Sequence, residues 1–427
     1  MLPEIFTKIP GQKSLDWAAR LAAVECRNTT FLVDDWPIFW ERAAGANVWD
    51  VDGNRFLDMT SGFGVAGLGY GFTGEALREQ SLSLLHAMGD VHPARVKVEL
   101  CEVLSEITFE KWTGKKGKCL FGCSGFEAVE AALKTAVLAT GRSGILSFEG
   151  GYHGLGYGAL LGAGIGWFRA PFEGQLARVT QRLAFPRTEQ ELEDFSEQIR
   201  KVDGTQVGAV LVEPIQGRGG IVVPAVGFLK VLRGWCDEVG AVLIFDEIYT
   251  GFWRTGRMFG CEWEAVVPDL ICLGKGMSGG FPISVCVGRA EVMDRWPLSD
   301  GEALHTSTFL GNPMGCAMAL EAIRRYREPE TKVIVAASCE ALAEALRPLG
   351  EMDCVHEVRG RGLMMGIQTG SGEKVLDVVK GLLRDGIIAL PDGPRGDVLA
   401  LTPALSVARE EIDFAVGRIQ ERLAMAR

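Results

Sequence analysis

The chain has 427 residues, 47% of them hydrophobic and 23% charged, which is enough for two or three globular domains with a sizeable core. Its net charge is −11 at pH 7 and no basic cluster interrupts this balance, so we expect neither nucleic acid nor an anionic membrane as a partner. Eleven cysteines without paired CxxC spacing, and only five histidines, argue against a metal site.

The N-terminal stretch lacks an apolar leader, and no apolar run reaches the length of a membrane span. Scattered thiols suit a reducing compartment, so we expect a cytoplasmic protein. The first element is an amphipathic helix over residues 14–26, with Ser14 as its predicted cap. A hairpin follows over residues 46–57, because Asp52-Gly53 is a strong turn signal.

Gly62 to Gly67 reads GFGVAG and matches the GxGxxG pattern of dinucleotide-binding loops. We expect no helix to open directly behind it, which weakens the match. A nucleotide-binding oxidoreductase is therefore the distant alternative for the function of this chain.

The next pattern is a predicted strand over residues 118–122, a glycine turn and a long helix that ends near Thr140. A helix that starts in this way presents unpaired backbone N–H groups and the positive end of its dipole. Because Gly125 and Phe126 begin the helix, their N–H groups are candidates for binding a phosphate. An ordinary strand–helix connection is the alternative interpretation.

Two short apolar runs end in polar side chains of complementary chemistry. Residues 241–245 precede Asp246, and residues 270–273 deliver Lys275 into a glycine-rich turn. Open α/β sheets bind ligands at the carboxyl ends of their strands. An acid and a lysine at these positions suit a cofactor with a basic ring nitrogen and an aldehyde, and pyridoxal 5′-phosphate (PLP) is such a cofactor. Taken alone, the pair is also compatible with a structural acid and a loop lysine.

The sequence around these two residues is a more specific signal than the pair itself. DEIYTGFWRTG, followed by PDLICLGKGMSGGFP, closely resembles the signature of class III (subgroup II) aminotransferases, and the resemblance runs over residues 36–405. It implies a fold-type I, PLP-dependent transferase of the α/β class. Such a protein has a large domain with a mostly parallel seven-stranded sheet flanked by helices. Its small α+β domain is built from both chain ends. We expect residues 1–60 and 313–427 in the small domain and 61–312 in the large one.

The resemblance also assigns residues to the PLP site. The segment CSGFEA is similar to the family's phosphate loop and places Ser124, Gly125 and Phe126 there, with Phe126 where a small residue is usual. In GYHG, Tyr152 is implied to lie over one face of the PLP ring, and Ile248 is implied to press on the other. We regard His153, in the same tetrapeptide, as structural.

Three further residues are implied to contact PLP. Glu213 ends a predicted strand over residues 207–212 and would lie on the O3′ side of the ring. Tyr249 stands where the family has a glutamine that hydrogen-bonds O3′, and its hydroxyl can do similar work. Thr308, in HTSTFLGNP, is implied to reach the phosphate of a neighbouring subunit, so we expect a homodimer with shared active sites, possibly assembled into a tetramer.

Candidate substrate residues depart from the family. Phe63 and Gly64 lie in the glycine-rich segment that is implied to shape the substrate pocket. Arg218 replaces the usual glutamate of EPxQGEGG, and Ala400 stands where relatives carry a carboxylate-binding arginine. We hypothesise that Arg218 binds a substrate carboxylate, or that the amine donor is not an acid. An arginine exposed at the rim is the alternative.

These residues imply an ω-transaminase-like aminotransferase that moves an amino group from an amine or amino acid to a keto acid or aldehyde by ping-pong chemistry. Lys275 is the covalent attachment point and the general base, and Asp246 keeps the ring nitrogen protonated. The alternatives on the same fold are an aminomutase of the glutamate-1-semialdehyde type and a decarboxylase. The decarboxylase is disfavoured because its relatives carry Trp where Tyr152 stands.

Overall fold

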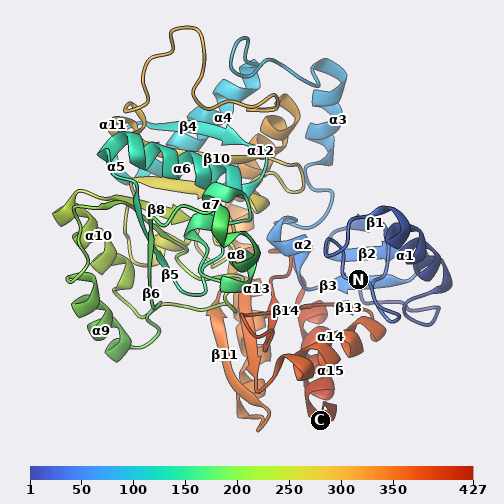
Figure 1. Ribbon diagram of the computed structural model, residues 1–427. Helices are drawn as coiled ribbons and strands as arrows, with labels where there is room; N and C mark the ends of the chain where they lie inside the picture. Colours follow the sequence, from blue (N-terminus) through green and yellow to red (C-terminus); the bar gives the residue numbers. More distant parts are fainter. Residues whose placement is uncertain (427) are drawn as a thin grey trace. The chain divides into compact units, whose positions relative to one another are not determined.

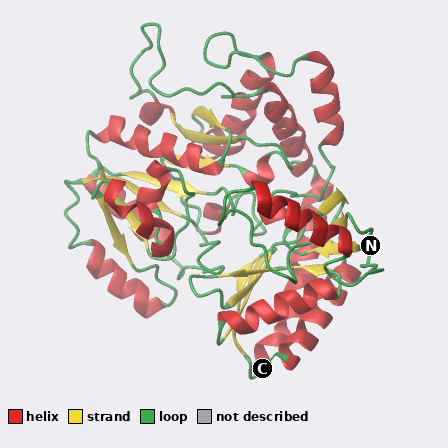
Figure 2. Cartoon of the chain, turned by 45° about the vertical axis from the view of Figure 1, so that its right-hand side comes forward, coloured by secondary structure: helices red, strands yellow, loops and turns green. Residues whose placement is uncertain are grey.

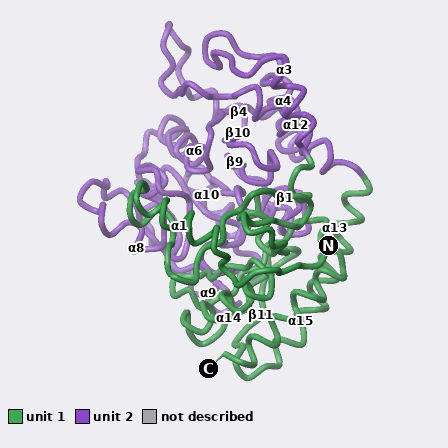
Figure 3. Tube along the Cα trace, turned by 90° about the vertical axis from the view of Figure 1, so that its right-hand side faces the viewer, with its two compact units in different colours: residues 1–72, 329–427 green, residues 73–328 purple. Residues whose placement is uncertain are grey.

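The computed structural model describes residues 1–426, which form two compact units (Figure 3). Unit 1 combines residues 1–72 with the chain from residue 329 onward, and unit 2 comprises residues 73–328. The predicted domain boundaries, at residues 60/61 and 312/313, lie elsewhere in the chain, and the division into functional domains stays a prediction.

Unit 2 is built on a seven-stranded sheet with helices on both of its faces (Figures 1 and 2). Its strands, in order across the sheet, are β4 (Gly117–Gly122), β10 (Ser284–Arg289), β9 (Leu270–Leu273), β8 (Val242–Asp246), β7 (Val207–Val212), β5 (Gly144–Phe148) and β6 (Thr180–Leu183). Only β10 runs antiparallel to its neighbours in this sheet. Every residue of β7, β8 and β9 is buried, as the unbroken apolar runs predict.

The helices of unit 2 pack mainly on this sheet. They are α3 (Gly74–Ser83), α4 (Arg95–Ser105), the π-helix η1 (Glu106–Glu110), α5 (Lys111–Thr113), α6 (Gly125–Thr140), α7 (Tyr157–Gly162), α8 (Gly166–Arg169), α9 (Glu189–Ile199), α10 (Phe228–Val239), α11 (Ala290–Met293) and α12 (Pro313–Tyr326), with the 3-10 turns η2 (Ala170–Gln175), η3 (Gly260–Trp263) and η4 (Lys275–Met277). Helix α6 contributes the alanine-rich face Ala128, Ala131, Ala132 and Ala136 to the core, which lets it lie close to the strands.

Unit 1 contains two four-stranded sheets and the chain termini. One sheet has the order β1 (Trp40–Ala44), β2 (Asn47–Asp50), β3 (Arg55–Asp58) and β13 (Ile387–Ile388), and the other has the order β11 (Val355–Arg361), β12 (Met364–Thr369), β15 (Val398–Leu401) and β14 (Leu390–Asp392). The helices are α1 (Gln12–Val24), α2 (Ser61–Gly64), α13 (Pro329–Leu346), the 3-10 turn η5 (Arg347–Glu351), α14 (Gly372–Arg384) and α15 (Arg409–Met425).

One local prediction needs correction. Ser14 is not the cap of the first helix: α1 begins at Gln12 after Gly11, and the buried Ser14 hydroxyl donates to Asp52 Oδ2 at 2.7 Å. The expectation that no long helix opens directly behind the GxGxxG match is confirmed. Residues 61–64 form only the short α2, and α3 does not begin until Gly74, so the strand–turn–helix context of a dinucleotide-binding loop is missing.

The predicted hairpin is confirmed, with β2 paired to β3 in antiparallel register. Asp50 accepts hydrogen bonds from the N–H groups of Asp52 and Asn54, so these are turn residues. Within residues 1–426 no group of three or more His, Cys, Asp or Glu side chains could hold a metal ion. No helix in the same range is long and apolar enough to cross a membrane.

Candidate active site

Asp246 ends β8 and is only 4% exposed. Its Oδ2 accepts a hydrogen bond from Nδ1 of His153 at 2.8 Å, and its Oδ1 accepts one from the backbone N–H of Ile248 at 3.1 Å. His153 is also buried, in the loop that follows β5. Because a carboxylate only accepts, Nδ1 is the protonated nitrogen of this imidazole, and the bond fixes the orientation of the Asp246 side chain.

Lys275 follows the neighbouring strand. Strands β8 and β9 are parallel, with Asp246 opposite Cys272, so Lys275 leaves the sheet at the same end as Asp246. Lys275 opens the turn η4 with φ +44°, a left-handed conformation that is strained for a non-glycine residue. Its Nζ lies 4.0 Å from the centre of the Tyr249 ring. The lysine, the aspartate and Tyr249 therefore belong to one edge of the sheet.

The loop between β4 and α6 is held in place from two sides. The Glu127 carboxylate accepts hydrogen bonds from the N–H groups of Cys123 at 2.6 Å and Ser124 at 2.7 Å, and the Ser284 hydroxyl donates to the Ser124 carbonyl at 2.6 Å. Within the described chain the hydroxyl of Ser124 is buried and has no hydrogen-bond partner. Such a hydroxyl carries a desolvation penalty that a ligand oxygen would relieve.

Ile248 packs against the same loop. A Cβ on Gly125 would lie 2.9 Å from Cδ1 of Ile248, and one on Gly274 would lie 3.5 Å from its Cγ2. Glycine at position 125 thus lets this side chain approach the start of α6. Ile248 is half-buried and stands two residues beyond Asp246, between the predicted phosphate loop and the turn that carries Lys275.

Phe126 departs from the family pattern, and its neighbours accommodate the larger side chain. A Cβ on Gly154 would lie 2.4 Å from Cβ of Phe126, and one on Gly156 would lie 2.3 Å from its ring. Two glycines in the loop after β5 therefore make room for this phenyl group. Its backbone N–H remains at the first turn of α6, where a phosphate would lie.

Glu213 follows β7 and links two loops. Its Oε1 accepts the backbone N–H of Tyr152 at 2.9 Å, and its Oε2 accepts the backbone N–H of Gly217 at 2.9 Å. Both oxygens are thus engaged by backbone groups. The carboxylate positions Tyr152 after β5 and, at the same time, the turn that carries Arg218.

The charges near Glu213 interact strongly. Burial raises the pKa of Glu213 to about 7; the Asp246 carboxylate adds to this rise, while His153 opposes it. Burial also raises the pKa of the Tyr152 phenol, and the nearby charge of Arg218 opposes that rise. Arg218 therefore lies within electrostatic range of Tyr152, at the sheet edge that also carries Asp246.

Thr308 and Phe63 are exposed in the single chain. Thr308 is in an exposed loop of unit 2, next to Phe309, which is 56% exposed. Phe63 and Gly64 belong to unit 1, where Phe63 is 57% exposed.

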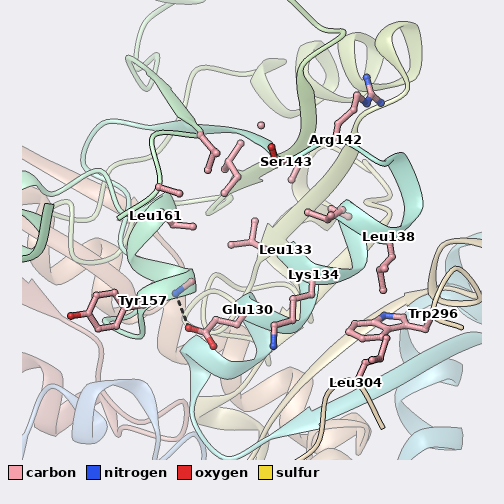
Figure 4. A pocket seen from close by; sticks show the side chains of 18 residues that line it. Glu130, Leu133, Lys134, Leu138, Arg142, Ser143, Tyr157, Leu161, Trp296 and Leu304 are labelled. Atoms are coloured by element: carbon pink, nitrogen blue, oxygen red, sulfur yellow. Dashed lines mark hydrogen bonds between the residues drawn. The ribbon is translucent and has the colours of Figure 1, made fainter. Parts of the chain in front are cut away.

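A pocket of about 660 Å³ lies beside α6 and is lined by none of the predicted site residues (Figure 4). Figure 4 shows Leu161 on one side of it and Trp296 with Leu304 on the other. The Glu130 carboxylate, which accepts the Gly158 N–H at 2.8 Å, is among its few polar groups. The pocket is mostly apolar, although Glu130 and Lys134 are in its lining, and neither Asp246 nor Lys275 lines it.

The residues at the sheet edge fit PLP. The unpartnered hydroxyl of Ser124 and the first N–H groups of α6 suit a phosphate, and the buried Asp246 suits a protonated ring nitrogen. Lys275, from the adjacent strand end, suits the aldehyde. The sheet with one antiparallel strand, and the two mainly antiparallel sheets of the smaller unit, are those of fold-type I PLP-dependent transferases.

Comparison with known proteins gives the family. Residues 32–423 match the class-III aminotransferase family. The chain is 36% identical to the acetylornithine aminotransferase of Methanopyrus kandleri over 390 residues, covering 91% of this chain and 94% of that protein. It is 34% identical over 443 residues to the 4-aminobutyrate aminotransferase of Mycobacterium leprae, covering 95% of each.

A solved structure agrees with these sequence matches. An amine transaminase from an uncultivated Pseudomonas species, in its PLP-bound form, superposes with a TM-score of 0.86 at 27% identity, covering 95% of this chain and 99% of the other. The chain belongs to the class-III aminotransferase family, whose enzymes transfer amino groups with PLP as cofactor. The nucleotide-binding, aminomutase and decarboxylase alternatives are not favoured.

The sequence interpretation did not find two hydrogen bonds that hold the site. His153 was expected to be structural, and its hydrogen bond to Asp246 spans 93 positions of the chain. Ser284, on β10, fastens the Ser124 loop across 160 positions. The GYHG tetrapeptide was a usable signal for the histidine, whereas nothing in the pattern around Ser284 pointed to its role.

Proposed function

We propose that this aminotransferase moves an amino group from an amine or amino acid to a keto acid or aldehyde, with Lys275 and Asp246 as its catalytic residues. The observation that carries the proposal is the buried Asp246, oriented by His153 at 2.8 Å, at the strand end next to the one that carries Lys275. A buried acid that is oriented in this way suits a ring nitrogen that must stay protonated.

When bound, PLP supplies an aldehyde that carries the amino group and a ring that accepts electrons. Lys275 would hold the cofactor aldehyde through Nζ and would serve as the base for the carbon-bound proton of the substrate. Asp246 holds the proton at the ring nitrogen, and His153 holds Asp246. Tyr152 and Ile248 restrict the tilt of the ring, while Ser124, Gly125 and Phe126 hold the phosphate.

Glu213 and Tyr249 complete the proposed cofactor site, on the O3′ side of the ring. For Glu213 the support is indirect, because both of its oxygens already accept backbone N–H groups. Its contribution is therefore to position Tyr152. Tyr249 is supported by its place beside Lys275 Nζ, 4.0 Å from the ring centre.

The proposed assembly is a homodimer in which Thr308 of one subunit reaches the phosphate bound by the other. Thr308 is exposed in the single chain, and Leu298, Leu304 and Phe309 in the same segment are 98%, 69% and 56% exposed. A loop with several exposed apolar side chains favours contact with a second copy. The eleven cysteines are free thiols, which supports a cytoplasmic location.

Arg218 is the proposed contact for a substrate carboxylate. It is half-buried, and its charge acts on Tyr152, which is implied to cover the ring face. Replacing Arg218 by Ala should then raise KM for carboxylate-bearing acceptors about tenfold and leave KM for simple amines unchanged. Arg200→Ala, at an exposed position of the same unit, is the matched control. If KM is unchanged for every acceptor in the Arg218 variant, Arg218 is a solvent-exposed side chain that does not bind the substrate.

The central test is spectroscopic. Purified protein with PLP should show visible absorbance from the lysine-bound cofactor, and Lys275→Ala should lose that band and its turnover, by on the order of 10³-fold or more. Lys201→Ala, an exposed lysine of the same unit, should keep both. Amino transfer that needs no external acceptor would instead indicate an aminomutase. A Lys275→Ala variant with an unchanged spectrum excludes Lys275 as the attachment point.

A further inference from the structure

Lys275 is itself the left-handed residue of the turn that carries it. It stands two residues beyond the end of β9, and its φ is +44°. A residue with a Cβ adopts this conformation only at a cost, because the Cβ atom approaches the following carbonyl group. Such a residue persists where its surroundings hold it, and strain of this kind is concentrated at functional sites. The contacts that hold this turn therefore decide where Nζ of Lys275 lies.

The sheet holds the chain before Lys275. Strand β9 pairs with β8 on one side and with β10 on the other. Inside the turn, the Met277 N–H donates to the Gly274 carbonyl at 2.9 Å, but the Ser278 N–H reaches the Lys275 carbonyl only at 3.5 Å. The turn is thus weakly closed on its C-terminal side, where a hydrogen bond from another element has the most effect.

Tyr326, the last residue of α12, supplies such a hydrogen bond. Its hydroxyl donates to the carbonyl of Gly276 at 2.7 Å, across 50 positions of the chain. Tyr326 is 0% exposed. Burial raises the pKa of its phenol, so the hydroxyl keeps the proton that it donates. The chain is therefore held before Lys275 by the sheet and one residue after it by this hydroxyl.

A second left-handed segment holds Tyr326. Phe252 and Trp253, in the loop after β8, have φ angles of +55° and +69°. The indole Nε1 of Trp253 donates to the Tyr326 carbonyl at 3.0 Å, and the ring centres of Phe252 and Tyr326 are 5.6 Å apart. The last carbonyl of a helix has no partner within that helix, and Trp253 provides one from outside. The loop that begins at Asp246 and the turn that carries Lys275 are thus joined through one tyrosine.

We propose that Tyr326 is a positioning residue for Lys275: its hydroxyl holds the Gly276 carbonyl and thereby the left-handed turn that directs Nζ. This inference rests on the proposed amino-transfer function and adds to it a residue outside the cofactor and substrate contacts. Tyr326 acts through the backbone of the turn. In the alternative interpretation Tyr326 is a tyrosine of the core, and only the packing of its ring matters.

The substitution Tyr326→Phe separates the hydroxyl from the ring. The phenyl group keeps its packing on Phe252, and the donor to Gly276 is lost. Thr108→Val is the matched control, because Thr108 is also 0% exposed and its hydroxyl donates to the carbonyl of Leu104 at 2.6 Å. That carbonyl belongs to α4 and not to the turn. Both variants lose one buried hydroxyl that donates to a carbonyl, so they should lose similar stability.

Single-turnover kinetics of the holoenzyme test the position of Nζ. Tyr326→Phe should lower the rate constant for proton transfer from the amine donor about tenfold, because Nζ is less often in place. The donor concentration that gives half the maximal rate should change less than twofold, since Nζ does not bind the donor. Thr108→Val should keep the wild-type rate constant. A role in packing alone would lower the amplitude, which counts the active sites, and leave the rate constant unchanged.

Amide hydrogen exchange of the apoprotein gives a readout that needs neither cofactor nor turnover. The Met277 N–H donates to Gly274 only while the turn keeps its shape. Its exchange should accelerate about fivefold in Tyr326→Phe and stay at the wild-type rate in Thr108→Val. The peptide that spans residues 270–281 reports this difference.

The substitution Trp253→Phe tests the same arrangement from the other side, and it is the second variant if Tyr326→Phe does not fold. It removes the donor to the Tyr326 carbonyl and keeps an aromatic ring. The single-turnover rate constant should fall about threefold. In the double variant Trp253→Phe should add nothing to Tyr326→Phe, because Trp253 acts through the position of the phenol.

Three results overturn the inference. They are an unchanged single-turnover rate constant in Tyr326→Phe, unchanged exchange of the Met277 amide in that variant, and additive effects in the double variant. A wild-type holoenzyme that transfers no amino group refutes the proposed function instead. The exchange experiment on the apoprotein still reports in that case whether Tyr326 holds the turn, so the two failures are distinguishable.

Discussion

Two buried aspartates, Asp58 in unit 1 and Asp246 in unit 2, each end a strand, yet they are bound differently. Asp58 accepts four donors, two on each oxygen. Asp246 accepts two, one on each oxygen, from His153 and from the backbone of Ile248. A carboxylate has about four acceptor sites, so the chain itself saturates Asp58 and leaves about half of the capacity of Asp246 for a ligand.

The origin of the donors differs as well. Those of Asp58 come from Thr60, Gly62 and Tyr70, within 12 positions of the chain, so the acid shapes its own loop. The imidazole on Asp246 comes from 93 positions away, on a different element. Asp58, whose acceptor sites are all used by the chain, organises the backbone around it. Asp246 is oriented but keeps free acceptor sites, so it can bind a charged partner. Substitution at each site should separate these two roles.

The largest expected effect is that of Asp246→Asn. A carboxylate about 4 Å from a cation contributes roughly 4 kcal/mol at an effective dielectric near 20, which corresponds to about three pKa units at the ring nitrogen. Turnover should fall by about 10²- to 10³-fold while much of the PLP remains bound. Asp50→Asn, which is equally buried in unit 1, should keep its turnover. Full activity in Asp246→Asn, measured with saturating PLP, contradicts the role assigned to this residue.

A pH effect of similar size is expected from Glu213, whose pKa rises from 4.5 to about 7 on folding, chiefly through burial. Between these values the unfolded chain has lost the proton that the folded chain retains. The free energy of unfolding should therefore fall as pH rises from about 4.5 to about 7, by up to roughly 3 kcal/mol, and then level off. Denaturant titrations at a series of pH values measure the slope.

The control for this slope is Glu149→Gln, because Glu149 is an exposed glutamate of the same unit. That variant should keep the wild-type pH dependence. Glu213→Gln should flatten it, and should also lose stability at every pH, because an amide cannot accept from both Tyr152 and Gly217. A wild-type slope retained in Glu213→Gln assigns the titration to another buried acid.

Much of unit 2 could be predicted from the sequence, because its central strands are continuous apolar runs that end at polar or glycine residues. Strands β7 and β9 have the predicted bounds. Periodicity and turn chemistry act locally, so they suffice for such elements. The family resemblance then named the candidate site residues, whose roles stay predictions.

What the sequence could not reveal depends on distant partners. Ser14 has the residue type of a helix cap, but Asp52, 38 positions away, takes its hydroxyl and the helix starts earlier. The left-handed turn at residues 61–64 was equally hidden, because Ser61 and Phe63 are not residues that signal positive φ. In the sequence, Asp58 and Asp246 have the same pattern, an acid directly after an apolar run. Only their donors in three dimensions distinguish them.

A smaller effect is expected at His153, which tests whether Asp246 needs its orienting donor. His153→Phe removes a hydrogen bond to a charged group, so kcat should fall about tenfold. His153→Asn should recover part of this loss, because its amide can donate from nearly the position of Nδ1. His356→Gln, at an exposed position, is the control. Equal losses in the Phe and Asn variants point to a packing role for the imidazole.

The smallest effect, and the one that best separates a ligand contact from a structural fault, is expected at Ser124. Three buried hydroxyls lack partners in the described chain, those of Ser124 before α6, Ser147 within β5 and Thr180 at the start of β6, and the two serines make a matched pair. Removing either should stabilise the apoprotein by about 1 kcal/mol, because an unsatisfied polar atom leaves the interior. The two variants should differ once PLP is present.

Ser124→Ala should weaken PLP binding about fivefold, so its advantage in thermal stability should vanish or reverse on cofactor addition. Ser147→Ala should keep its advantage with and without PLP, because that hydroxyl lies within the sheet, 0% exposed. Melting temperatures at several PLP concentrations measure both. If Ser124→Ala remains stabilised at saturating PLP, the phosphate is bound by backbone N–H groups alone. The unsatisfied hydroxyl of Ser124 is then a structural fault, like that of Ser147, and not a ligand contact.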